Sequence, residues 1–92
     1  MQYDSNAKSK KLIKTVGELV KKHRIAQNKT IYRISAEVGV PKATWRELEL
    51  GLKDFRFTTI WKVAEGLDIP PDKLIKELSD SLGENFSLCD LK

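Results

Sequence analysis

Five residues in one short stretch carry side chains suited to contacting the edges of nucleic acid bases. They are Lys42, Ala43, Thr44, Arg46 and Glu47. Lysine and arginine donate hydrogen bonds to guanine O6 and N7, glutamate accepts one from cytosine N4, and alanine or threonine packs on the thymine methyl. On a helix, Lys42 and Arg46 are four residues apart and share one face. The pattern therefore favours recognition of a ligand over catalysis.

The residues around this stretch predict two short helices joined by a tight turn. Thr30 can cap the first helix, Gly39 suits the left-handed backbone that ends it, and Pro41 suits the first position of the second. A helix-turn-helix places its second helix, here about residues 41–50, in the major groove of DNA.

Apolar residues recur at helical spacing along most of the chain, and no stretch alternates convincingly over the length of a strand. We expect an all-α five-helix bundle. Its other helices cover about 11–26, the segment from Thr30 to Gly39, 57–67 and 71–82. Residues 11–82 form the domain, 1–10 a flexible basic arm, and 83–92 a short C-terminal extension. The side chains expected to face inward include Ile31, Trp45, Phe55, Phe57, Trp61, Ile75 and Leu82.

The charge distribution is uneven along the 92 residues, whose net charge is +4. Residues 1–62 carry 14 Lys and Arg against 6 Asp and Glu, whereas residues 63–92 carry 3 against 7. A basic first part with an acidic end suggests one surface made for an anion. The chain lacks a long apolar run or a secretory signal and has one cysteine, so we expect a cytoplasmic protein without membrane contact.

No arrangement in the sequence is typical of an enzyme. It contains no Ser/His/Asp, Cys/His or paired-carboxylate pattern and no glycine-rich phosphate loop. His23 and Cys89 are too few for a metal site. We therefore expect no catalytic residues, no metal and no cofactor.

Four segments within residues 12–78 resemble the Xre/phage-repressor (Cro-like) type of helix-turn-helix domain. They are Val16-Gly17 with Val20 and Arg24, Ile34-Ser35 with Val38-Gly39-Val40, Glu49-x-Gly51, and Ala64-x-x-Leu67. The resemblance implies a lambda-repressor-like bundle in which Arg24 and Glu49 form a structural salt bridge. The chain departs from the family at Ile31, where the family usually has a polar residue that helps to hold a phosphate. It also departs at His23, Lys29 and Phe55.

The resemblance implies a small transcriptional regulator that binds double-stranded DNA. It would act as a repressor and bind a palindrome as a homodimer. The base contacts would come from Lys42, Ala43, Thr44, Arg46 and Glu47, although Thr44 could pack instead and Glu47 could pair with a lysine. The phosphate contacts would come from Lys29, Thr30, Arg33, Lys53 and Arg56.

The acidic C-terminal part of the chain leaves two questions open. Leu82, Phe86, Leu88 and Leu91 could supply the dimer contact or fold back onto their own core. An alternative function is a protein-interaction module, such as an antitoxin or partner-dependent regulator, that binds a protein through the C-terminal extension and DNA only weakly alone.

Overall fold

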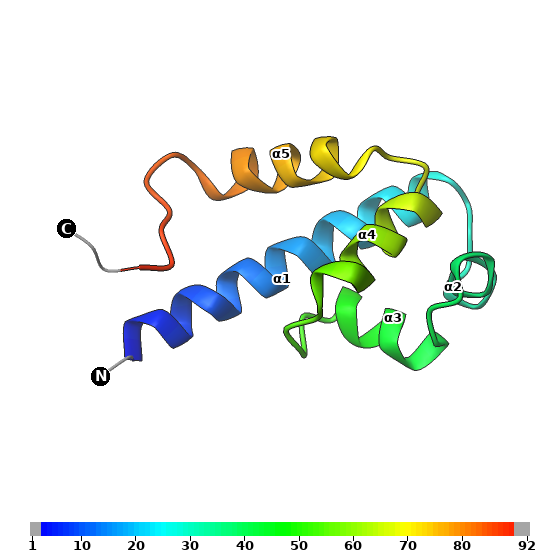
Figure 1. Cartoon of the computed structure of the whole chain (residues 1–92), viewed down its shortest axis with the longest axis horizontal. Helices are drawn as coiled ribbons and strands as arrows, with labels where there is room; N and C mark the ends of the chain where they lie inside the picture. The colour runs from blue at the N-terminus through cyan, green and yellow to red at the C-terminus, as the bar shows by residue number, and fades with distance from the viewer. Residues whose placement is uncertain (1–2, 90–92) are drawn as a thin grey trace.

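Five α-helices make up the part of the chain that the computed structural model describes, residues 3–89. They are α1 (Tyr3–Ala26), α2 (Ile31–Val38), α3 (Lys42–Glu49), α4 (Phe57–Gly66) and α5 (Pro71–Leu82). The long α1 packs against α3 and α5, while α2 packs against α3 and α4 (Figure 1). This is the expected all-α bundle. None of the described helices is long and apolar enough to cross a membrane.

The first helix is longer than the sequence pattern predicted. It begins at Tyr3 rather than near residue 11, so residues 3–10 are helical instead of forming an irregular arm; residues 1–2 lie outside the described part. No proline or glycine interrupts residues 3–10, and extending a formed helix costs far less than nucleating one. This end projects past the other helices (Figure 1), which explains why it has no apolar periodicity.

Local signals set the boundaries of α2 and α3. The Thr30 hydroxyl oxygen accepts a hydrogen bond from the Arg33 N–H at 3.1 Å, which caps α2. Gly39 ends α2 with φ 70°, in the left-handed region that glycine enters without steric cost. Pro41 is the N-cap of α3 rather than its first helical residue, so α3 begins at Lys42.

The core lies where α1, α2, α3 and α4 meet. Its fully or almost fully buried members are Val20, Ile34, Val40, Trp45, Leu48, Val63 and Leu67. Trp45 is completely buried, as expected, and Phe55 and Ile31 are half-buried against the same cluster. The core therefore fixes the position of α3 through its central tryptophan.

Three side chains expected inside are exposed. Phe57 is 61% exposed, Trp61 48% and Ile75 39%. Phe57 and Trp61 are four residues apart and share a face of α4, beside the buried face that carries Val63. Helical periodicity identifies an apolar face, but it does not show how much of that face another helix covers.

The C-terminal extension folds back over part of its length. Leu82 and Phe86 are half-buried and line a shallow pocket with Leu12 and Leu78. The Lys11 ammonium lies 5.9 Å from the centre of the Phe86 ring. Leu88 is exposed, and Leu91 lies outside the described residues. Among the described residues, Phe86 thus contacts its own chain.

Candidate nucleic-acid interface

Two features fix the turn between α2 and α3: the backbone conformation of Gly39 and the burial of the Val40 side chain. Gly39 supplies the left-handed backbone, and the Val40 N–H donates to the Ser35 carbonyl at 3.0 Å. The Val40 side chain is then buried in the core. Ser35 is itself buried, which is consistent with a small residue where the helices approach closely. The angle between α2 and α3 is therefore set by the sequence of the turn.

A bidentate ion pair joins α1 to α3. Arg24 Nε donates to Glu49 Oε2 at 2.6 Å and Nη2 donates to Oε1 at 3.0 Å. The side chains are only 13% and 5% exposed. Glu49 Oε2 also accepts a hydrogen bond from Trp45 Nε1 at 2.8 Å. The hydrogen bond to Glu49 raises the pKa of Arg24 above its ordinary value.

The same arginine reaches the loop before α2. Arg24 Nη1 donates to the Lys29 carbonyl at 2.8 Å. One guanidinium thus connects the end of α1, the entry to α2 and the end of α3. Because planar guanidinium–carboxylate pairs have a fixed geometry, this cluster orients α3 relative to the rest of the bundle.

Gly17 allows a close approach of α1 and α3 that the sequence alone did not reveal. A Cβ built at this position would lie 2.3 Å from the Leu48 carbonyl oxygen. Any side chain here would push the two helices apart. The glycine in the Val16-Gly17 pair was the only signal in the sequence, and it gave no indication of what lies opposite.

The outer face of α3 carries the residues expected to contact bases. Lys42, Ala43 and Arg46 are exposed, whereas Thr44 and Glu47 are half-buried. Among the described residues, neither Lys42 nor Arg46 has a carboxylate partner. Glu47 Oε1 lies 3.3 Å from Lys53 Nζ, so it pairs with a lysine, as the sequence left open.

Tyr32 belongs to this surface and was missed from the sequence. It is exposed on α2, and the Lys42 ammonium lies 5.8 Å from the centre of its ring. A helical wheel of α2 would have placed Tyr32 on the side of the helix away from the buried Ile34, but nothing in the sequence indicated that it meets Lys42. The ring can hold the ammonium at the front of α3 by a cation–π contact.

The expected phosphate contacts of α2 include two cations that share one carboxylate. Lys29 Nζ lies 2.8 Å from Glu37 Oε1, and Arg33 Nε lies 3.2 Å from Glu37 Oε2. The hydrogen bond from Lys29, followed by that from Arg33, lowers the pKa of the Glu37 carboxyl. The cluster keeps a net positive charge, and exposed pairs of this kind exchange easily with other anions.

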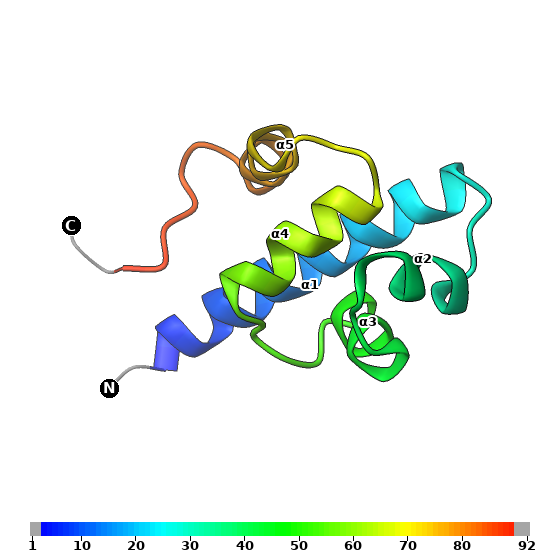
Figure 2. The ribbon, with the colours of Figure 1, turned by 45° about the vertical axis from the view of Figure 1, so that its right-hand side comes forward.

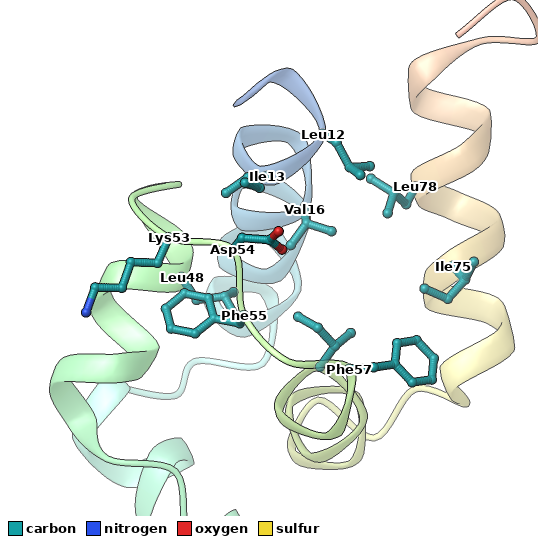
Figure 3. Close-up of a pocket in the computed structure, with 11 residues that line it drawn as sticks. Leu12, Ile13, Val16, Leu48, Lys53, Asp54, Phe55, Phe57, Ile75 and Leu78 are labelled. Carbon is teal, nitrogen blue, oxygen red and sulfur yellow. The ribbon is translucent and has the colours of Figure 1, made fainter. Parts of the chain in front are cut away.

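The remaining expected phosphate contacts lie at the start of α2, in the loop between α3 and α4, and at the start of α4. Thr30 is exposed at the start of α2, and Arg56 is exposed at the N-cap of α4. Lys53 lies in the loop after α3, with its side chain directed away from the apolar cavity beneath that loop (Figure 3). Figures 1 and 2 show α2 and this loop on opposite sides of α3. The candidate phosphate contacts therefore flank the candidate base contacts.

In residues 3–89, the described side chains include no group of three or more His, Cys, Asp or Glu that could hold a metal ion. His23 instead has its Nε2 2.7 Å from Glu77 Oε1, which links α1 to α5.

Comparison with known proteins identifies the architecture. The model of the helix-turn-helix family matches residues 20–74, which is more than half of the chain. A comparison with curated proteins found no match. This family consists of DNA-binding regulatory domains rather than enzymes. The chain belongs to the helix-turn-helix family of the Xre/lambda-repressor type, and it is a DNA-binding regulator of that kind.

Proposed function

We propose that this protein recognises a specific sequence of double-stranded DNA, with α3 in the major groove. The observation that carries the proposal is that α3 is held in a fixed position while its outer face is exposed. Glu49 ties α3 to Arg24, while Lys42, Ala43 and Arg46 of the same helix remain exposed. Rigid support matters because base contacts depend on placing donors accurately.

The exposed side chains support distinct base contacts. Lys42 and Arg46 donate to guanine O6 and N7, and Ala43 packs on a thymine methyl. Thr44 is half-buried and contributes its methyl or hydroxyl at the edge of the groove. Glu47 either accepts from cytosine N4 or keeps Lys53 in place for a phosphate, an arrangement that their 3.3 Å contact supports.

Phosphate contacts set the position of α3 in the groove without reading the sequence. On one side they come from Thr30 and the first backbone N–H groups of α2, whose dipole favours an anion. At the start of α2, Ile31 can donate a hydrogen bond to a phosphate only through its backbone N–H. When DNA binds, Lys29 and Arg33 release the Glu37 carboxylate and contact phosphate oxygens instead. On the other side, Lys53 and Arg56 contact the next stretch of backbone.

The protein acts as a homodimer on a palindrome, with half-sites about one helical turn, ~34 Å, apart. It represses by occupying its site and excluding other proteins, and it works in the cytoplasm, beside the DNA. It has no catalytic activity and needs no cofactor.

A protein-interaction module is the second candidate, favoured by the exposed Phe57, Trp61 and Ile75. Ile31 and Phe86 are half-buried, so they offer less apolar surface to such a partner.

Selection from a random duplex library tests the proposal. We expect enrichment of one palindrome, with an affinity that falls steeply as salt rises because phosphate contacts release counterions. The double variant Lys42→Ala, Arg46→Ala should lose the preference for that palindrome and keep weak, salt-sensitive binding. The matched control Lys21→Ala, Lys22→Ala removes two exposed α1 lysines and should retain the preference. Equal preference in both double variants would exclude α3 as the recognition helix.

A further inference from the structure

A cavity lies beneath the loop that joins α3 to α4. It has a volume of about 180 Å³ and is enclosed by α1, α4, α5 and that loop (Figure 3). Protein interiors contain few voids larger than a water molecule, so a space of this size is unusual in so small a domain. Most of the side chains that line it are apolar: Leu12, Ile13, Val16, Leu48, Phe55, Phe57, Ile60, Ile75 and Leu78.

The size of the cavity and its apolar walls indicate what it can hold. A buried water needs about 2–4 polar partners, which these walls do not supply, whereas an apolar cavity of about 150 Å³ can hold one benzene ring. Phe57 and Ile75 line the cavity and are 61% and 39% exposed, so they lie where it meets the solvent. The cavity therefore suits one small apolar ring that enters beside these two residues.

The charges at the cavity favour a cation. Two charged residues line it, Lys53 and Asp54, both in the loop. The Lys53 side chain is directed away from the cavity, and its Nζ lies 3.3 Å from Glu47 Oε1, whereas the Asp54 carboxylate lies on the cavity side of the loop (Figure 3). Within the described part of the chain, Asp54 has no ion-pair partner. An ammonium group at the cavity would give this carboxylate a charge-assisted hydrogen bond.

We propose that this cavity is a binding site for a small apolar amine, with a single ring among the apolar side chains and the ammonium group at Asp54. Burial of the ring supplies most of the affinity. The carboxylate sets the orientation of the ligand, as isolated polar groups do in mainly apolar sites. An acid of the same size would be excluded, because its carboxylate would face that of Asp54.

The location of the cavity connects the amine site to DNA binding, a step that rests on the proposed function. The loop over the cavity carries Lys53, and Arg56 follows at the N-cap of α4. A bound amine would fix this loop and add a positive charge beside these two candidate phosphate contacts. Amine and duplex should therefore each strengthen the binding of the other, since coupling between two sites is reciprocal.

An NMR titration of the ¹⁵N-labelled full chain with phenethylamine tests the site. We expect saturable amide shifts on residues 12–16, 53–57 and 75–78, with a dissociation constant on the order of 1 mM for so small a molecule. Phenethyl alcohol, which has the ring without the charge, should bind about 5-fold more weakly. Ethylamine, which has the charge without the ring, should produce no saturable shifts.

Four variants test the two halves of the site. Val16→Phe and, as a second variant, Ile75→Trp add a ring in the cavity or at its edge and should weaken phenethylamine binding at least ~10-fold. Asp54→Asn should weaken phenethylamine binding about 5-fold and leave phenethyl alcohol binding unchanged. The matched control Asp68→Asn should change neither, because Asp68 is exposed and does not line the cavity. Circular dichroism verifies that each variant is folded.

Two results would overturn the amine site. One is the absence of saturable shifts with phenethylamine, as expected if the Phe57 ring turns inward and fills the cavity. The other is binding of phenethylamine to Val16→Phe and Ile75→Trp as strong as to the unaltered protein. Loss of phenethylamine binding in Asp54→Asn no greater than in Asp68→Asn would refute the assignment of an amine.

The duplex selected from the library separates this proposal from the proposed function. At saturating phenethylamine, the unaltered protein should bind that duplex at least ~5-fold more tightly. Unchanged affinity for the duplex would refute the coupling and leave both the amine site and the DNA function intact. A protein that binds phenethylamine and selects no duplex would support the amine site and refute the DNA function.

Discussion

Replacing Glu49 with alanine removes one carboxylate that serves three N–H donors. Two belong to Arg24 at the end of α1, and the third is Trp45 Nε1 in the middle of α3. The truncation leaves a guanidinium and an indole N–H in a poorly hydrated place, because both side chains are buried or nearly so. The perturbation therefore tests whether this cluster holds α3 on the bundle.

The expected loss follows from these contacts. An indole N–H left without an acceptor costs ~1–3 kcal/mol, and breaking a buried ion pair costs ~3–5 kcal/mol. Arg24 keeps its bond to the Lys29 carbonyl and 13% of its side-chain exposure, so the low ends apply. The sum is about 4 kcal/mol, against a total stability of roughly 5–14 kcal/mol for a domain of this size. The melting temperature should fall by about 15–30 °C.

Thermal and urea denaturation followed by circular dichroism measure this loss. Glu37→Ala is the matched control, because the Glu37 carboxylate also accepts from two cations but is much more exposed. We expect its melting temperature to remain almost unchanged. A loss for Glu49→Ala as small as that for Glu37→Ala would refute the view that the Arg24–Glu49 pair fixes α3.

Two further predictions concern α1 and α2. Gly17→Ala should cost ~1–3 kcal/mol in thermal denaturation, because its Cβ would meet the Leu48 carbonyl oxygen. Alanine's higher helix propensity, ~1 kcal/mol, acts in the opposite direction, so unchanged or raised stability would contradict the close packing. The Glu37 carboxyl should titrate below its ordinary pKa of 4.5 in a ¹³C NMR pH series, since two cations favour its charged form. The contribution of the charged Glu37 carboxyl to stability is present above pH 4.5 and is lost as the pH falls through its lower pKa in the folded state. An NMR midpoint at or above pH 4.5 would contradict the pairing of Glu37 with Lys29 and Arg33.

Much of the fold could be predicted because its boundaries depend on local chemistry. Thr30 caps α2 through its own hydroxyl, and Gly39 ends α2 through its own backbone freedom. The start of α1 could not be predicted from apolar spacing, since helix propagation at Tyr3 needs no buried face. The exposure of Trp61 could not be predicted either, because it depends on which helices cover α4.

Some contacts of the candidate site could be predicted before the structure was known, and others could not. The resemblance suggested the pair of Arg24 and Glu49, and the structure shows both side chains in bidentate contact. The pairing of Lys29 with Glu37 depends on the path of the chain into α2, which spacing alone does not give. The contact of Lys42 with Tyr32 depends on the angle between α2 and α3. The base and phosphate contacts themselves stay predictions.

The most direct test of the central claim is an NMR titration of the uniformly ¹⁵N-labelled protein with the selected duplex. Binding by α3 predicts that the largest amide shifts fall on residues 42–47, with flanking shifts on 30–33 and 53–57. The amides of the exposed Lys21 and Lys22 on α1 should change little. Shifts concentrated on α1 or α5, with residues 42–47 unaffected, would contradict the claim that α3 is the recognition helix.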